Sequence, residues 1–393
     1  MENSGGFGKM KTSIENRSQD KREPAVKQRG GNQKGVIMKN YAVDAEKLEN
    51  FTQRLFRTAG LSDADASAVA ELLVHADLRN VRSHGVLRVA PYLDKIEHGG
   101  ASLRSTYPVV HETPVSAVID AEGGLGAVAG TKAVKIAREK AQKAGMALVA
   151  VRNGNHFGMA GHWAMKLAGE DCIGFACSTT DLTMGAPGSR EPFLGNNPFA
   201  FAVKAGDKYP EFCVDMATST VAMGKCKDLA KRGKAIPSGW MLDKDGNDTT
   251  DLSKCYMMTT MAGHKGFGIA LVVEIFSTFL AGGVLSPDIN NQDLPDVPEL
   301  SSQAFGCIRI SAFRDLTEFQ KSAEEYIDRL HKLPMREGMP AAKYPGEIEY
   351  GNKQINRREG VVLPETLVRD LIEIGAKHGV DGSFLKQRET DRQ

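Results

Sequence analysis

Apolar residues in the first third of the chain recur at the three- and four-residue spacing of amphipathic helices. Leu48, Phe51 and Leu55 predict a helix that begins near residue 44, and similar spacing predicts a second helix over 62–78. A third helix follows the segment RSHG and stops at Gly99, a typical glycine stop signal. We therefore expect the N-terminal part of the folded chain to be helical.

Beyond residue 114, short apolar runs with strand character alternate with glycine turns and helices. A strand at 115–119, a glycine loop, a helix at 131–144 and a strand at 146–151 follow one another, which is an order typical of α/β proteins. More elements are expected further on: strands at 173–177, 199–203, 211–214 and 306–310, and helices at 265–280 and 317–330.

Residues 1–39 are polar and lack apolar periodicity, so we predict a disordered basic extension. Its charge is about +5 and that of the remainder about −4, within a total of +1. Such a near-neutral chain argues against nucleic-acid binding, which requires a strongly basic surface. We expect a helical substrate-side part at 40–120, a cofactor-binding α/β part at 121–350 and a C-terminal segment at 351–393 that packs back on the body.

Neither a membrane span nor a metal site is predicted. The apolar run 269–285 is interrupted by Glu274 and by Gly282-Gly283 and is shorter than the roughly 20 residues that a span needs, so it predicts a buried helix. The six cysteines form no CxxC pair and have no zinc-type spacing. Free, mostly buried thiols are typical of a reducing compartment, so we expect a cytoplasmic protein.

Gly124 to Ala129 fit the loose G-x-G-x-x-A pattern of dinucleotide-binding loops. The signal is weak, because the following strand ends on Arg152-Asn153 without an acidic residue to bind a ribose hydroxyl. On the residues alone, a Rossmann-type site at this loop stays an open alternative.

Two histidines stand out as candidates for chemistry. His84 lies in RSHG, with Arg88 and Tyr92 following at four-residue steps, and His156 lies in the loop NGNHFG directly after a predicted strand. A guanidinium can bind a carboxylate in bidentate form, and an imidazole can exchange a proton near neutral pH. This combination suits a 2-hydroxy or 2-oxo acid substrate. Lys265, in the glycine-rich turn AGHKGFG at a predicted helix start, is a candidate for binding a phosphate or carboxylate.

With these segments in place, the chain resembles the malate/L-lactate dehydrogenase family of the second type, which includes L-sulfolactate, ureidoglycolate and diketogulonate-type oxidoreductases. The resemblance runs from about residue 44 to about 350. The segments that carry it are RSHGVLRVAPYLDKIEHGG, VRNGNHFGMAGHWAM, EPFLGNNPFAFAV, FCVDMATSTVAMGK, IPSGWMLDKDGNDTTD, GHKGFGIALVVEI and YPGE.

The resemblance implies NAD(P)-dependent interconversion of a 2-hydroxy acid and its 2-oxo acid by a homodimer. It also implies a non-Rossmann, L-sulfolactate dehydrogenase-like α/β fold with a mixed β-sheet flanked by helices, which would make the loop at Gly124 an ordinary turn. The implied acid/base is His84 or His156, with Ser83 and Arg88 on the substrate side. The cofactor, NAD or NADP, is expected at Thr180, Asp215, Met216, Ala217, Lys265, Gly346 and Glu347.

Some positions depart from the family's usual pattern. The turn at 195–198 reads Gly-Asn-Asn-Pro where Gly-Thr-Asn-Pro is usual, and Ser301-Ser302-Gln303 stands where an Asn-Leu-Gly stretch is common. These departures concern the substrate more than the reaction class. The alternative from another class is a catalytically silent homologue that acts as a binding or scaffold protein, and the joint presence of the candidate site residues argues against it.

Overall fold

The computed structural model describes residues 39–231 and 233–392. Lys39 to Gln393 form one compact unit. The predicted disordered extension therefore lies, except for Lys39, outside the described residues. The boundaries expected near residues 120 and 350 stay predictions.

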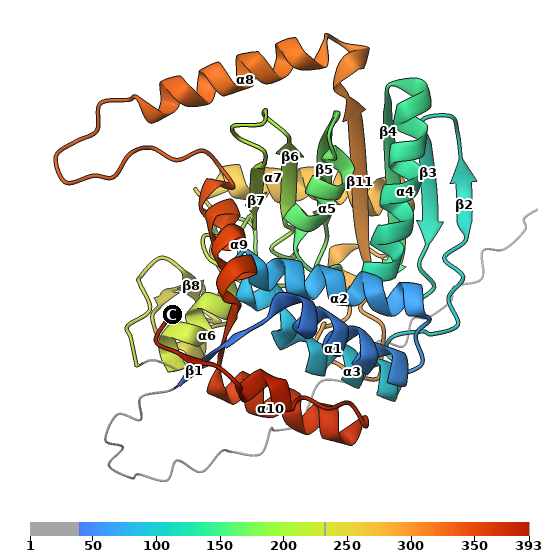
Figure 1. Cartoon of the computed structure of the whole chain (residues 1–393). Helices are drawn as coiled ribbons and strands as arrows, with labels where there is room; N and C mark the ends of the chain where they lie inside the picture. Colours follow the sequence, from blue (N-terminus) through green and yellow to red (C-terminus); the bar gives the residue numbers. More distant parts are fainter. Residues whose placement is uncertain (1–38, 232, 393) are drawn as a thin grey trace, which may run out of the picture. The chain divides into compact units, whose positions relative to one another are not determined.

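A mixed seven-stranded sheet forms the centre of this unit (Figure 1). One pair of strands, β3 and β4, runs parallel, and the other neighbours are antiparallel. The strands, in sheet order, are β2 (Val109–Glu112), β3 (Ser116–Asp120), β4 (Met146–Gly154), β11 (Ser301–Arg309), β5 (Cys172–Ser178), β6 (Phe199–Val203) and β7 (Phe212–Met216).

Two small sheets accompany the central one. In the first, the N-terminal strand β1 (Asn40–Val43) lies between β12 (Val361–Pro364) and β13 (Glu389–Thr390), so the two ends of the unit pair with each other. The second has the order β10 (Met257–Met258), β8 (Met241–Leu242) and β9 (Asp248–Thr249).

The predicted N-terminal helices are present as α1 (Ala45–Thr58), α2 (Asp63–Leu78) and α3 (Val89–His98). The side chain of Asp44 accepts a hydrogen bond from the backbone N–H of Lys47, and Ser62 caps α2 in the same way. Such caps typically stabilise a helix by about 1 kcal/mol. The predicted third helix is preceded by two short 3₁₀ turns, η1 (Arg82–His84) and η2 (Val86–Arg88), which carry the RSHG segment.

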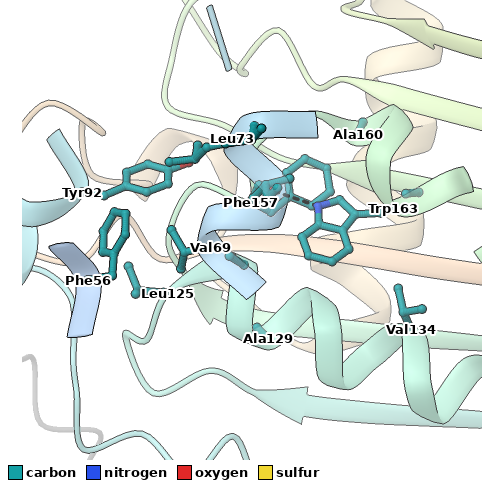
Figure 2. Packing of buried hydrophobic residues seen from close by; sticks show 14 of the residues in the cluster. Phe56, Val69, Leu73, Tyr92, Leu125, Ala129, Val134, Phe157, Ala160 and Trp163 are labelled. Atoms are coloured by element: carbon teal, nitrogen blue, oxygen red, sulfur yellow. Dashed lines mark hydrogen bonds between the residues drawn. The ribbon is translucent and has the colours of Figure 1, made fainter. Parts of the chain in front are cut away.

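Helices cover both faces of the central sheet. Helices α4 (Gly126–Ala144) and α5 (Ala160–Ala168) lie in front of the sheet in Figure 1, and α7 (His264–Glu274) lies behind it. Between the sheet and the front helices, Trp163 stacks on Phe157 and meets Phe305 edge-on, and its indole N–H donates to the carbonyl of Phe157 at 2.7 Å (Figure 2). The other helices are α6 (Met223–Lys231), α8 (Leu316–His331), α9 (Glu347–Glu359) and α10 (Glu365–Lys377).

The apolar run 269–285 forms a helix over part of its length, as expected, but the expectation that this helix is buried was wrong for one of its sides. Helix α7 ends at Glu274, a π-helical turn η4 (Ile275–Phe279) follows, and the apolar side chains that face away from the sheet are exposed. Hydrophobic residues occupy the whole circumference of this helix. Only one side can pack on the sheet of its own chain, so the apolar residues on the other side stay exposed. Phe279 is 60% exposed and Ile275 is 49% exposed.

The glycine loop before α4 is a packing turn. Helix α4 begins at Gly126 and connects the parallel strands β3 and β4, as the α/β pattern predicted. A Cβ at Gly126 would overlap the backbone carbonyl of Asn155, so glycine is required for the helix to approach the end of β4 closely. The loop supports the segment that carries His156.

Candidate active site

The loop after β4 holds His156 on a rigid support. Asn155 is buried, and its side-chain amide donates to the carbonyls of Gly123 at 2.8 Å and Gly100 at 3.1 Å, while its Oδ1 accepts from the backbone N–H of Glu299 at 3.0 Å. On the other side of His156, the ring of Phe157 is buried in the core in Figure 2. These contacts fix the direction in which the imidazole points.

His84 is held by the turns between α2 and α3. Buried Asp77 accepts a hydrogen bond from the backbone N–H of Val86 at 2.7 Å, and a Cβ at Gly85 would overlap that carboxylate. Ser83 Oγ lies 2.9 Å from His84 Nδ1. Burial raises the pKa of Asp77 to about 7, although the Val86 N–H lowers it.

The two predicted histidines lie face to face. The rings of His84 and His156 stack with centroids 5.4 Å apart, and Tyr92 Oη lies 2.6 Å from His156 Nδ1. Arg88 donates from Nε to the carbonyl of Ser83 at 2.9 Å. The structure thus brings together all four residues predicted for catalysis, and adds Tyr92.

Burial keeps both imidazoles neutral. It lowers the pKa of His84 to about 4, with the charge of Arg88 acting in the same direction. The pKa of His156 is well below its usual value for the same two reasons, with a further contribution from His84. At neutral pH each ring therefore carries one N–H and one nitrogen lone pair, and can accept a proton.

A cavity of about 700 Å³ lies beside these histidines. Asp215 lines this cavity, and its carboxylate accepts a hydrogen bond from the backbone N–H of Gly161 at 2.9 Å. Desolvation of the carboxylate raises its pKa to about 6. All but two of the residues predicted for the site line the cavity: Ser83, His84, Arg88, His156, Thr180, Asp215, Met216, Ala217 and Gly346.

Lys265 and Glu347 do not line the cavity. Lys265 is exposed in the first turn of α7. The carboxylate of Glu347 is occupied by Lys343 and by His331, whose Nε2 lies 2.9 Å away. Glu347 therefore anchors the loop that precedes α9 instead of facing the cavity.

The cavity wall suits a phosphate-bearing cofactor. Gly346 caps the N-terminus of α9 with a positive φ of 91°, and a Cβ there would lie 2.8 Å from the backbone nitrogen of Cys213. Glycine therefore lets this helix N-terminus, which favours anions, approach the start of β7 closely. The apolar side chain of Met216 lines the same cavity. This arrangement fits a nicotinamide dinucleotide.

Sequence reasoning missed three groups at this site. Tyr92 was noted only for its position four residues after Arg88, a spacing that does indicate a shared helix face. Asn155 and Glu299 gave no local signal, because their roles depend on contacts with distant loops.

Within the described part of the chain, no group of three or more His, Cys, Asp or Glu side chains is arranged to hold a metal ion. The described residues also contain no helix long and apolar enough to cross a membrane.

Comparison with known proteins shows the family of this chain. Residues 43–372 match the family model described as malate/L-lactate dehydrogenase. The malate dehydrogenase of Pyrococcus horikoshii is 34% identical over 364 residues, which cover 89% of this chain and 99% of that protein. The ureidoglycolate dehydrogenase (NAD(+)) of Escherichia coli K12 is 29% identical, over 84% of this chain and 94% of its own length.

The fold is also that of a solved structure. Sulfolactate dehydrogenase from Methanocaldococcus jannaschii superposes with a TM-score of 0.81 at 32% identity, over 87% of this chain and 98% of that chain. The predicted α/β fold and the resemblance are therefore confirmed, and the Rossmann alternative is not supported. This chain belongs to the malate/L-lactate dehydrogenase family and is a hydroxy acid dehydrogenase.

Proposed function

We propose that this enzyme transfers a hydride between NAD or NADP and a 2-hydroxy/2-oxo acid of the malate/oxaloacetate or lactate/pyruvate type, with His156 as the acid/base. The observation that supports the proposal is that one cavity is lined by His84 and Arg88, at the ends of the turns η1 and η2, and by His156, in the loop after β4. Five of the seven predicted cofactor positions line the same cavity.

Each residue near the histidines has a distinct role in this proposal. Arg88 binds the substrate carboxylate, because its guanidinium matches a carboxylate geometrically. His156 Nε2 exchanges a proton with the C2 oxygen, since its Nδ1 is occupied by Tyr92. Ser83 orients His84, which closes the other side of the substrate.

The predicted cofactor positions form the remaining wall. Thr180, the segment Asp215 to Ala217 and Gly346 would hold the dinucleotide, and Lys265 is proposed to reach it from the first turn of α7. When bound, the nicotinamide supplies or accepts the hydride at C4. The protein's contribution is orientation, exclusion of water and control of the proton.

The test is steady-state kinetics with NADH and NADPH on pyruvate and oxaloacetate. His156→Ala is expected to lower kcat by about 10²–10⁴-fold, the usual contribution of a positioned acid/base. Arg88→Lys is expected to raise KM for the 2-oxo acid. His111→Ala, on the exposed edge strand β2, serves as the matched control. Turnover by His156→Ala at the level of this control would refute the assignment.

Two further features support a homodimer in the cytoplasm as part of the proposal. The apolar side chains on the outer side of α7 and η4 form an exposed surface that a second copy would cover. All six cysteines are free thiols, and five of them are buried, as expected in a reducing compartment.

A further inference from the structure

The cavity has two ends, which lie toward opposite edges of the central sheet. Strands β4, β5 and β7 run in the same direction, because β4 and β5 pair antiparallel with β11, and β6 pairs antiparallel with β5 and β7. The cavity-lining residues His156, Thr180 and Ala217 follow the ends of these three strands. Gly346 lies instead against Cys213, at the start of β7. Along the strand direction, the N-terminus of α9 is therefore about one strand length from the histidine end, roughly 13 Å for a strand of five residues.

This separation assigns the two halves of a dinucleotide to the two ends. In the proposed function, the hydride is transferred beside His156, so the nicotinamide half occupies the first end. The second end then takes the adenosine half, with the pyrophosphate near the N-terminus of α9. NAD and NADP differ only in this half: NAD has a free 2′-hydroxyl on the adenosine ribose, and NADP has a phosphate there.

Glu349 places a carboxylate at the adenosine end. It lies in the first turn of α9, lines the cavity and is partly buried. Its charge acts on both Asp215 and Cys213, which line the same wall. Within the described part of the chain, the Glu349 carboxylate has neither a hydrogen-bond donor nor an ion-pair partner. Its oxygens are therefore available to a ligand.

The basic side chains at this end are already paired with other carboxylates. Arg79 and Lys343 line the cavity here. Arg79 shares Glu211 with Lys353, and Lys343 pairs with Glu347. Two cations on one carboxylate leave an excess of positive charge beside Arg79, which suits the pyrophosphate that NAD and NADP have in common. Among the residues that the structure describes, no unpaired cation lines this end to receive a further phosphate.

We propose that Glu349 makes the enzyme selective for NAD over NADP by accepting hydrogen bonds from the hydroxyls of the adenosine ribose. A carboxylate accepts such bonds strongly, because it is charged. A phosphate monoester carries about −1.5 to −2 charges near neutral pH, so the 2′-phosphate of NADP would be repelled by Glu349. This inference rests on the proposed function and chooses between its two cofactors.

Binding of NADH and NADPH to the free enzyme tests the inference without turnover. Titrations that follow nicotinamide fluorescence, with no 2-oxo acid present, should give a Kd for NADPH at least about tenfold higher than for NADH, because a charged hydrogen bond is lost. Equal Kd values, or tighter binding of NADPH, would overturn the inference. Absence of binding by both nucleotides would instead refute the proposed function.

Two variants identify the residue responsible for the selectivity. Glu349→Gln keeps the shape of the side chain and removes its charge, so the ratio of Kd for NADPH to Kd for NADH should fall by about fivefold or more. Glu349→Arg supplies a guanidinium for the 2′-phosphate and should bring the ratio below one. An unchanged ratio in both variants would assign the selectivity to another residue and overturn the proposal.

Glu318→Gln is the matched control. Glu318 is the third residue of α8, as Glu349 is of α9, but it does not line the cavity. Its ratio should equal that of the wild type, and a fall as large as that in Glu349→Gln would contradict a role specific to Glu349. If neither Glu349 variant folds, the wild-type ratio still decides between the two cofactors.

Discussion

Tyr92 Oη lies 2.6 Å from His156 Nδ1, and no other hydrogen-bond partner of this hydroxyl exists among the described residues. Burial raises the pKa of Tyr92, so the phenol stays neutral. When His156 takes up a proton at Nε2, its Nδ1–H needs an acceptor, and Tyr92 Oη is the acceptor at hand. In the proposed mechanism, Tyr92 is therefore a positioning residue for the proton transfer.

Tyr92→Phe should lower kcat by about 10- to 100-fold, because an unpaired buried donor costs about 1–3 kcal/mol. The protonated form of His156 loses its acceptor, so its pKa should fall further. In the direction of 2-oxo acid reduction, which requires that protonated form, the decline of rate with rising pH should therefore shift to lower pH. The measurements are pH profiles of kcat in both directions.

Tyr326→Phe, at a tyrosine that is 75% exposed on α8, is the control and should behave as the wild type. A Tyr92→Phe profile that has the wild-type shape, with only a uniform loss of rate, would indicate a packing role for the hydroxyl instead.

The glycine beside His84 gives a second prediction. Gly85→Ala places a Cβ against the buried Asp77 carboxylate, which holds the Val86 N–H. We expect a loss of about 1–3 kcal/mol in the free energy of unfolding, as is typical of overpacking, and a lower kcat because His84 moves.

Gly351→Ala is the control for this variant. Gly351 lies inside α9, and no atom lies within 4 Å of a Cβ built there, so the free energy of unfolding should rise by up to about 1 kcal/mol. Denaturant unfolding measures both. Equal stability of the two variants would show that the turn relaxes freely.

The sequence predicted the elements that consist of apolar residues and are bounded by turn residues. Strand β6 at Phe199–Val203 matches the prediction at both ends, because apolar residues fill it and glycine and proline turns flank it. Strand β11 begins at Ser301, five residues before the predicted start. Its first residues, Ser301, Ser302 and Gln303, are polar but completely buried, and no periodicity reveals a polar side chain in a sheet interior.

The residues of the candidate site that could be named from the sequence are those that local motifs mark. His84, Arg88 and His156 stand in glycine-rich turns at element ends, which is visible in one dimension. Glu299 and Asp181 become significant only when the loop before β11 folds against the end of β5, so their proximity is a property of topology. Glu347 shows the converse: it stands in a local motif, but its side chain contacts His331 and does not line the cavity.

The third prediction concerns Glu299. Burial, with the charge of Asp181, raises its pKa to about 8 from an ordinary value of 4.5. A raised carboxyl pKa means that the folded state holds the proton more tightly than the unfolded state. The contribution of this carboxyl to the free energy of unfolding is therefore fully present below pH 4.5, and it is lost as the pH rises from 4.5 to about 8.

Glu299→Gln removes this titration. The variant should gain stability relative to the wild type as pH rises through that window, by an amount on the order of a few kcal/mol. Urea unfolding at pH 5, 6, 7 and 8 measures the difference, with Glu373→Gln on the exposed side of α10 as a control that should show no trend. A pH-independent difference would mean that Glu299 is ionised in the folded protein throughout.

The fourth prediction concerns the exposed apolar side of α7 and η4. Val272, Ile275 and Phe279 project from it with 47%, 49% and 60% of their surfaces exposed. Apolar surface of this kind is costly in water and is typical of an interface between subunits. The double variant Ile275→Glu/Phe279→Glu should therefore be monomeric where the wild type is a dimer, as measured by light scattering after size-exclusion chromatography.

Val110→Glu is the control for that experiment, since Val110 is 48% exposed on the edge strand β2, away from this helix. It should leave the mass of the wild-type dimer unchanged. Because His84, Arg88 and His156 all come from one chain, the monomeric variant should retain its histidine-dependent chemistry, and a fall in kcat beyond tenfold would mean that the partner completes the cavity. A wild type that elutes as a monomer, or a double variant that elutes as a dimer, would contradict the assignment of this surface.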